Sequence, residues 1–278
     1  MIAAGSDLLV IGGLTIDRFA DGSSAAGGSV LHIARAAAPR GVRVRVVTVA
    51  GPEPEALAAL EELRGLAPSV EGADSTATFV HRESPTERRL WLERRGSSVR
   101  VPELDPSEMP HAILVASIAY EVSTDDLARL DATSTRGAIL QGFLRSFAPD
   151  GEVRPRQLSA LAPDLVAELS HFDLLVASRE DLLGEAADPP VQLAALRRCF
   201  GPRPELVVTD GVRGVFLESE HLPVPWQVDG VPSVGAGDIF AAFMLAEPWP
   251  RERDRGFLRE RAGTAMRVVA EVLEERRG

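Results

Sequence analysis

The sequence predicts an α/β protein with a mostly parallel central sheet that is covered by helices on both faces. The chain has 278 residues, 45% of them hydrophobic, so it can bury a sizeable core. Short apolar runs alternate with longer helix-like segments along most of its length, a pattern typical of strands joined by crossover helices. A hairpin-like pair of runs near 76–93 interrupts this alternation, and we expect it to project from the sheet.

The elements before residue 94 follow from local signals. The first strand is expected at 8–12, a short apolar run that ends in glycine. The first helix is expected at 27–38, because this alanine-rich segment begins with glycines and stops before Pro39. The hairpin turn is expected at 83–86, Glu-Ser-Pro-Thr. The other strands and the second helix are expected at 42–49, 76–81 and 88–93, and at 53–64.

The alternation resumes after the hairpin and continues to the end of the chain. The strands are expected at 112–116, 138–140, 174–177, 206–209 and 214–217. The helices are expected at 123–130, 156–169, 191–200, 237–246 and 257–275. The sequence shows no internal repeat and no long linker, so we predict a single domain over 1–278.

Composition excludes several classes of protein. A formal net charge of -11 argues against nucleic acid and anionic membranes as partners, although backbone N–H groups can still bind an anionic ligand. The single cysteine, Cys199, rules out an internal disulfide and fits a cytoplasmic protein. The five histidines lack metal-ligand spacing, so a zinc site is not expected. We expect no signal peptide, because residues 1–7 lack a basic segment, and no apolar run approaches membrane length.

The most informative stretch is Gly235-Ala236-Gly237-Asp238, which opens an apolar segment expected to be helical. Glycines allow a tight turn and bring bare N–H groups close to a ligand. The first turn of a helix also has unpaired N–H groups and a partial positive charge, which suit a phosphate. Asp238 has two interpretations, because it could cap the helix or act as a base beside a bound anion.

Three further features stand in chain order before this motif. Asp17 follows the first strand, the pair Gly27-Gly28 opens the first helix, and 209–214 is a strand end of the form Thr-x-Gly-x-x-Gly. Each one alone is compatible with an ordinary turn. In this order they resemble the PfkB (ribokinase-like) carbohydrate kinase family over nearly the whole chain. The resemblance implies a three-layer α/β/α sandwich with a mostly parallel central sheet. Many family members place lid strands between the positions of Asp17 and the glycine pair, and here only 18–26 fills that gap. We therefore expect a small, reduced β lid, formed mainly by about 76–93, with 15–26 as a further candidate.

The resemblance also implies a reaction, the transfer of the ATP γ-phosphate to a substrate hydroxyl. Asp238 matches the family's catalytic base, which takes the proton from that hydroxyl. Gly235, Ala236 and Gly237 match the anion hole, whose N–H groups meet charge on the transferring phosphoryl group.

Other matched positions imply binding roles. Thr209, Gly211 and Gly214 match the stretch that lies along the nucleotide phosphates. The stretch that holds substrate hydroxyls is matched at Asp17, Gly27 and Gly28.

A narrower resemblance concerns the acceptor. The segments 141–147, 150–153 and 175–181 look like those of plant-type myo-inositol kinases, which favours a cyclic polyol. Arg145, in the first segment, is a candidate substrate or phosphate contact, and a surface arginine is the alternative.

The sequence departs from the family pattern at three places. His32 stands where most members have asparagine, so it is a candidate substrate contact of different reach and charge. The usual Asn-x-x-Glu motif, linked to magnesium and phosphate, is degraded at 177–181. Glu180 is preferred for the acidic role, Asp181 is the second choice, and plain surface charge is the alternative. Pro232-Ser233-Val234 replaces a common Asp-Thr-Thr whose aspartate helps hold a monovalent cation, which argues against potassium activation.

The sequence therefore predicts a cytoplasmic small-molecule kinase that uses ATP and Mg²⁺ on a sugar or cyclic polyol. We expect a monomer or homodimer, with neither a nucleic-acid nor a membrane partner. A nucleoside kinase of the same family is one alternative. A catalytically weak or inactive ligand-binding protein of the same fold is another, motivated by His32 and the degraded 177–181 motif. A dinucleotide-dependent dehydrogenase is disfavoured, because 12–17 lacks Gly-x-Gly-x-x-Gly.

Overall fold

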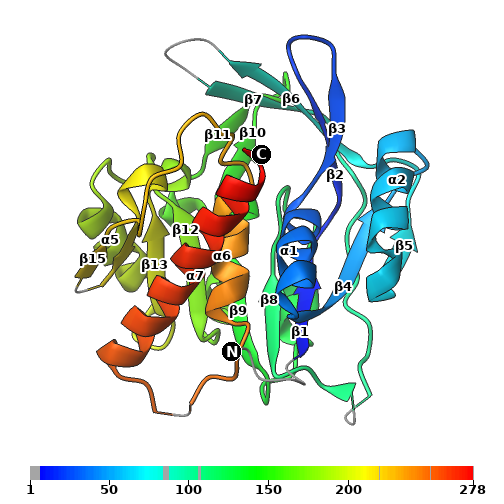
Figure 1. The fold of residues 1–278 in the computed structure, drawn as a ribbon. Helices are drawn as coiled ribbons and strands as arrows, with labels where there is room; N and C mark the ends of the chain where they lie inside the picture. Colours follow the sequence, from blue (N-terminus) through cyan, green and yellow to red (C-terminus); the bar gives the residue numbers. More distant parts are fainter. Residues whose placement is uncertain (1–6, 84–87, 106–107, 219, 251, 278) are drawn as a thin grey trace.

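A nine-stranded sheet forms the centre of the molecule (Figure 1). The computed structural model describes residues 7–83, 88–105, 108–218, 220–250 and 252–277, so residues 1–6 and most of the expected turn at 83–86 lie outside it. The strand order is β15-β14-β13-β12-β9-β8-β1-β4-β5. All neighbours are parallel except β13–β14 and β14–β15. The strands are β1 Asp7–Ile11, β4 Arg43–Ala50, β5 Ser69–Gly72, β8 Ala112–Val115, β9 Thr135–Ile139, β12 Leu174–Ser178, β13 Glu205–Thr209, β14 Val215–Leu217 and β15 Glu220–Leu222.

Helices cover both faces of this sheet and bury two apolar clusters. One face carries α1 Ser29–Ala37, α2 Pro54–Leu63, α6 Ala236–Met244 and α7 Arg255–Glu275. The other face carries α3 Thr124–Ala128, α4 Pro163–Leu169 and α5 Pro189–Phe200. Strand β1 shows the division, because Leu8 and Val10 belong to the first cluster and Leu9 and Ile11 to the second. The expected three-layer α/β/α sandwich is confirmed. No helix within the described ranges is long and apolar enough to cross a membrane.

A separate four-stranded sheet projects from the central one (Figure 1). Its order is β3-β2-β6-β7, with β2 Thr15–Arg18, β3 Ser24–Gly27, β6 Ala77–Glu83 and β7 Arg88–Arg94. A two-stranded ribbon, β10 Arg145–Phe147 and β11 Val153–Pro155, adjoins it through a bridge between Trp91 and Glu152. The expected lid segment 76–93 supplies β6 and β7, and the further candidate segment 15–26 supplies β2 and most of β3.

Several elements differ from the sequence-based expectation. The helix expected at 156–169 begins at Pro163, because Ala162 is held in an extended conformation before the proline. Strands β5, β10, β11 and β15 were not expected, and β2 and β3 were expected only as a candidate lid segment at 15–26. Each has three or four residues, too few for a clear alternation of apolar and polar side chains.

Gly28 sets the contact between the segment after β1 and the start of α1. Its φ is 106°, in the region that favours glycine, and a Cβ there would lie 2.6 Å from the carbonyl oxygen of Gly13. Gly41, at the end of the turn after α1, also has a positive φ of 69°, but a Cβ there would meet no atom within 4 Å. Gly41 is therefore a matched control for backbone strain without a steric clash.

We expect Gly28→Ala to lower the free energy of unfolding by about 3 kcal/mol or more, because strain and overpacking add. For Gly41→Ala we expect the free energy of unfolding to fall by about 1 kcal/mol, from backbone strain alone. Urea unfolding of the two variants would measure both values. Equal losses would show that the contact between Gly28 and Gly13 contributes nothing.

Candidate active site

The candidate site residues gather at one edge of the central sheet. Strands β1, β8, β9, β12 and β13 are parallel, so their carboxyl ends lie along the same edge. This edge of a parallel sheet is where α/β proteins bind ligands. The segments that leave these strands carry Asp17, Glu121, Arg145, Asp181 and Thr209. Helix α6 packs against β9 and β12, and its first turn brings Asp238 to the same group.

A tight turn at 233–236 leads into α6. The Ala236 N–H donates to the Ser233 carbonyl at 3.0 Å, and Gly235 has φ 80° and ψ -1°. The Ala236 N–H is therefore engaged, whereas the N–H groups of Gly235, Gly237 and Asp238 have no acceptor among the described residues. The expected anion hole at 235–237 thus has two of its three donors available, and the Asp238 N–H is a third.

Asp238 is not a helix cap. Gly235 occupies the cap position of α6, and no side chain caps the helix. Burial raises the pKa of Asp238 to about 6, while the Ser29 hydroxyl and the Arg145 guanidinium oppose this rise and Asp181 adds to it. The carboxyl group is therefore mostly ionised at neutral pH and close to its midpoint. Of the two interpretations from the sequence, the structure excludes the helix cap, and the base remains a prediction.

Ser29 is a site residue that sequence reasoning missed. It directly follows the predicted pair Gly27-Gly28, and its side chain is buried at the start of α1. Its hydroxyl has no hydrogen-bond partner of ordinary geometry within the described ranges. The sequence signal that could have identified Ser29 is a polar residue directly after a glycine pair.

Arg145 lies at the centre of the site. Its Nη1 donates to the Ile118 carbonyl at 3.2 Å, and its guanidinium lies 5.7 Å from the ring centre of Phe79 in the lid. Burial lowers the pKa of Arg145, and four carboxylates oppose that change: Asp181 most, then Asp238, Glu121 and Asp17. The alternative of a surface arginine does not hold, because the side chain is partly buried and its guanidinium interacts with the four carboxylates of the site.

The acidic segment after β12 brings Asp181, rather than Glu180, to this group. Glu180 is exposed, whereas Asp181 accepts a hydrogen bond from the Ser178 N–H at 3.2 Å. Burial raises the pKa of Asp181, and the nearby Arg145 lowers it. One residue of register separates the two acids, and the degraded motif did not fix that register. Asp181 therefore replaces Glu180 as our candidate for the acidic role.

Asp17 is held by the lid. Its Oδ1 lies 2.9 Å from Nε2 of His81 on β6, and a Cβ on Gly27 would lie 2.1 Å from its Oδ2. Gly27 is therefore required by the space that Asp17 occupies. His81 was not predicted, because nothing in the sequence ties position 81 to position 17.

His32 lies against the turn before α6. A Cβ on Gly235 would lie 2.5 Å from Cγ of the His32 ring. Burial, and then the charge of Arg276, lowers the pKa of His32 to about 4, so the ring is neutral. Its Nδ1 has no hydrogen-bond partner within the described ranges. The structure thus places His32 beside the candidate anion hole, and a substrate contact remains a prediction.

The candidate donor segment adjoins the same turn. Oγ1 of Thr209 would lie 3.8 Å from a Cβ on Gly237. Gly211 and Gly214 have φ of 52° and 97°, so both turn positions favour glycine. Arg179 holds this segment, because its N–H donates to the Thr209 carbonyl at 2.8 Å and its Nε to Asp210 at 2.8 Å.

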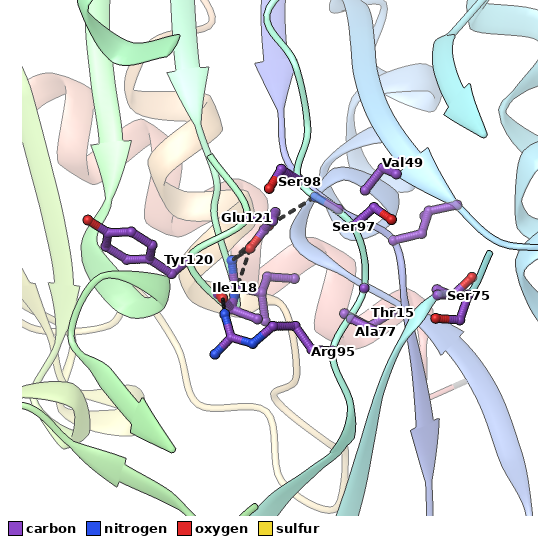
Figure 2. A pocket seen from close by; sticks show the side chains of 15 residues that line it. Thr15, Val49, Ser75, Ala77, Arg95, Ser97, Ser98, Ile118, Tyr120 and Glu121 are labelled. Carbon is purple, nitrogen blue, oxygen red and sulfur yellow. Dashed lines mark hydrogen bonds between the residues drawn. The ribbon is translucent and has the colours of Figure 1, made fainter. Parts of the chain in front are cut away.

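Glu121 anchors two of the loops, as Figure 2 shows. Its carboxylate accepts hydrogen bonds from the N–H groups of Gly13 at 3.0 Å and Ala119 at 2.7 Å. It also accepts from the Ser117 hydroxyl and the Ile118 N–H, both at 2.9 Å. The side chain thus ties the segment after β1 to the segment after β8. A lone glutamate in a loop gave no sequence signal for this role.

The cavity in Figure 2 is not the catalytic centre. It has a volume of about 50 Å³ and lies between the base of the lid and the loops that Glu121 joins. Arg95 closes one side by donating to the Ala119 carbonyl at 3.2 Å. This volume suits a few water molecules, and Asp238 does not line it.

The described residues contain no group of three or more His, Cys, Asp or Glu side chains that could hold a metal by themselves. Such a group is not needed for Mg²⁺ in a phosphoryl-transfer site. This ion keeps several waters and is bound by one or two carboxylates together with substrate phosphates. Asp181 fits that donor set.

Comparison with known proteins defines the fold class. No protein-family model and no curated protein matches the chain. A pyrophosphate-dependent kinase in the ribokinase family, complexed with a pyrophosphate analogue and myo-inositol, matches with a TM-score of 0.69 and 20% identity, over 96% of this chain and 93% of that one. A fructokinase with bound ATP from Xylella fastidiosa matches with a TM-score of 0.69 and 19% identity, over 96% of this chain and 92% of that one. An aminoimidazole riboside kinase from Salmonella enterica matches with a TM-score of 0.66 and 15% identity, over 96% of this chain and 93% of that one. This chain has the ribokinase (PfkB) fold, as its sequence predicts.

The raised pKa of Asp238 predicts a stability difference. An unfolded chain ionises this carboxyl near 3.8 and the folded protein near 6, so between these values the folded protein binds more protons. The contribution of Asp238 to the free energy of unfolding therefore falls as pH rises from about 3.8 to about 6. Asp238→Asn mimics the protonated form, so we expect it to be about 1–2 kcal/mol more stable than the wild type at pH 7.5. Near pH 4 the variant and the wild type should have nearly equal free energies of unfolding.

Urea unfolding at pH 4 and pH 7.5 would measure this difference. The matched control is Asp125→Asn, an exposed position in the first turn of α3, which should change little between the two pH values. An Asp238→Asn variant less stable than the wild type at pH 7.5 would contradict the burial of an ionised carboxylate.

Proposed function

We propose that this protein is a kinase that transfers a phosphoryl group to a hydroxyl of a sugar or cyclic polyol. One observation carries the proposal. A carboxyl group with a pKa of about 6 lies in the first turn of α6, beside three N–H groups that have no acceptor among the described residues. The pairing of a base with an anion-binding turn is what phosphoryl transfer to a hydroxyl requires.

Asp238 is the proposed base. With a pKa of about 6 it is mostly ionised at pH 7 and can accept the proton as the acceptor oxygen forms its bond to phosphorus. The proton moves from the acceptor hydroxyl to the Asp238 carboxylate, and the leaving group departs with the electrons of the broken P–O bond.

The proposed anion site combines main-chain donors with one cation. The N–H groups of Gly235, Gly237 and Asp238 would meet the oxygens of the phosphoryl group. Arg145, whose charge acts on both Asp181 and Asp238, would offset the negative charge that gathers during transfer. Such donors stabilise the transition state without reorganising, since the turn already holds them in place.

The acceptor is proposed to lie under the lid. Asp17, oriented by His81, offers a carboxylate oxygen to hydroxyl groups. Several hydroxyls on one ring suit a site that contains Asp17 and Asp238 together. The similarity of 141–147 to inositol-kinase segments supports a cyclic polyol, and so does the myo-inositol named in one structural neighbour. Closure of the lid would exclude water, which competes for the phosphoryl group.

The donor is proposed to lie along Thr209, Gly211 and Gly214. ATP is the donor that the sequence predicts. Inorganic pyrophosphate is the second candidate, because a structural neighbour is named as pyrophosphate-dependent. Mg²⁺, when bound, supplies charge neutralisation on the donor phosphates, and Asp181 is the side chain proposed to hold it.

We expect acceptor-dependent phosphoryl transfer in a screen of inositols, hexoses, pentoses and nucleosides with ATP or pyrophosphate as donor and Mg²⁺ present. Asp238→Asn should lower kcat by about 10³-fold, because the base is lost, while Asp125→Asn should behave as the wild type. Product formation followed by phosphorus NMR would measure this. Tight polyol binding without turnover in the wild type would instead favour the non-catalytic alternative, and turnover confined to nucleosides would favour the nucleoside kinase.

The proposal also predicts a pH profile. The base must be unprotonated, so kcat/KM should fall below an apparent pKa of about 6. Initial rates measured between pH 5 and pH 8 would show this fall in kcat/KM at acidic pH. A wild-type rate that stays flat down to pH 5 would remove Asp238 from the role of base.

A further inference from the structure

The turn before α6 has a geometry that can change by rotation of one peptide. The hydrogen bond from Ala236 to Ser233 and the dihedral angles of Gly235 match a type II turn with Gly235 as its third residue. Type I and type II turns differ mainly in the orientation of the central peptide, here between Val234 and Gly235. Glycine adopts either sign of φ, so Gly235 permits the type II form without enforcing it.

Arg276 holds that central peptide from the far end of the chain. It follows the last residue of α7, and its Nη1 donates to the Val234 carbonyl at 2.7 Å and the Pro232 carbonyl at 3.5 Å. The side chain therefore reaches back to residues that directly precede the candidate anion hole.

Acidic side chains near Arg276 are paired with other cations, which leaves its guanidinium to hydrogen-bond these carbonyls. Two acids of the last turns of α7, Glu271 and Glu275, pair with Arg40. Within the described ranges the Arg276 guanidinium pairs with no carboxylate and donates to no group other than these two carbonyls. His32 and Arg35 of α1 are the charged or titratable neighbours. His32 is neutral because its pKa is lowered to about 4, and Arg35 is bound to Glu62.

We infer that Arg276 is a positioning residue that locks the Val234–Gly235 peptide in the type II orientation. The C=O and N–H groups of a trans peptide point in opposite directions. With the Val234 carbonyl held on Arg276, the Gly235 N–H points away from α7, toward the proposed phosphoryl site. Rotation of this peptide would turn the N–H away and present a carbonyl oxygen to the phosphate. The inference rests on the proposed function and adds a residue far in sequence from its motifs.

The kinetic test compares Arg276→Gln with Arg277→Gln, the neighbouring exposed arginine. We expect Arg276→Gln to lower kcat 10- to 100-fold with the KM of the acceptor and the unfolding temperature little changed, and Arg277→Gln to match the wild type. Millimolar guanidinium should restore part of the rate of Arg276→Gln, since its charged N–H groups can donate to the same carbonyls, and urea, whose N–H donors are neutral, should restore less. A wild-type kcat for Arg276→Gln would overturn the inference.

A crystal structure of Arg276→Gln tests the same point without any activity. We expect Gly235 to lose its single positive φ and to show a rotated or mixed Val234–Gly235 peptide. An unchanged type II turn in the variant would overturn the inference. If the wild type transfers no phosphoryl group but the variant's turn rotates, the proposed function fails and the role of Arg276 in the turn stands.

Discussion

The site depends on one partly buried positive charge, the guanidinium of Arg145. Burial lowers the pKa of this group, and the charges of Asp17, Glu121, Asp181 and Asp238 oppose that change. An uncompensated buried charge costs several kcal/mol, on the order of 3–5 when one partner is removed. The four carboxylates arrive on the lid, on two loops at the sheet edge and on α6. The lid, the sheet and the helix must therefore meet correctly for this charge to be tolerated.

Two opposing effects set the chemistry of Asp238. Burial and the neighbouring Asp181 raise its pKa, whereas the Ser29 hydroxyl and Arg145 lower it. Burial prevails, but only to a value of about 6, so the carboxyl group remains ionised at neutral pH and still accepts a proton readily. The turn that begins at Ser233 adds unpaired N–H groups at the same place, and Arg276 fixes the orientation of one of its peptides.

The sequence predicted the parts that local patterns determine. Strand–helix alternation gave the fold, and Gly235 and Gly28 were visible because positive φ angles and close contacts require glycine. The missed parts depend on tertiary pairing. The short lid strands β2 and β3 pair with each other and, through β2, with β6, which is distant in sequence. Neither His81 nor Arg276 carries a local signal of its partner. The pattern likewise could not choose between the adjacent acids at 180 and 181.

The most direct measurement is a crystal structure with a bound cyclic polyol and a non-hydrolysable donor analogue. The account predicts an acceptor hydroxyl within hydrogen-bond distance of Asp238 and terminal phosphoryl oxygens on the N–H groups of Gly235 and Gly237. Arg145 should lie beside that phosphoryl group. A donor whose phosphates lie away from the 233–238 turn, or a polyol with no hydroxyl facing Asp238, would contradict it.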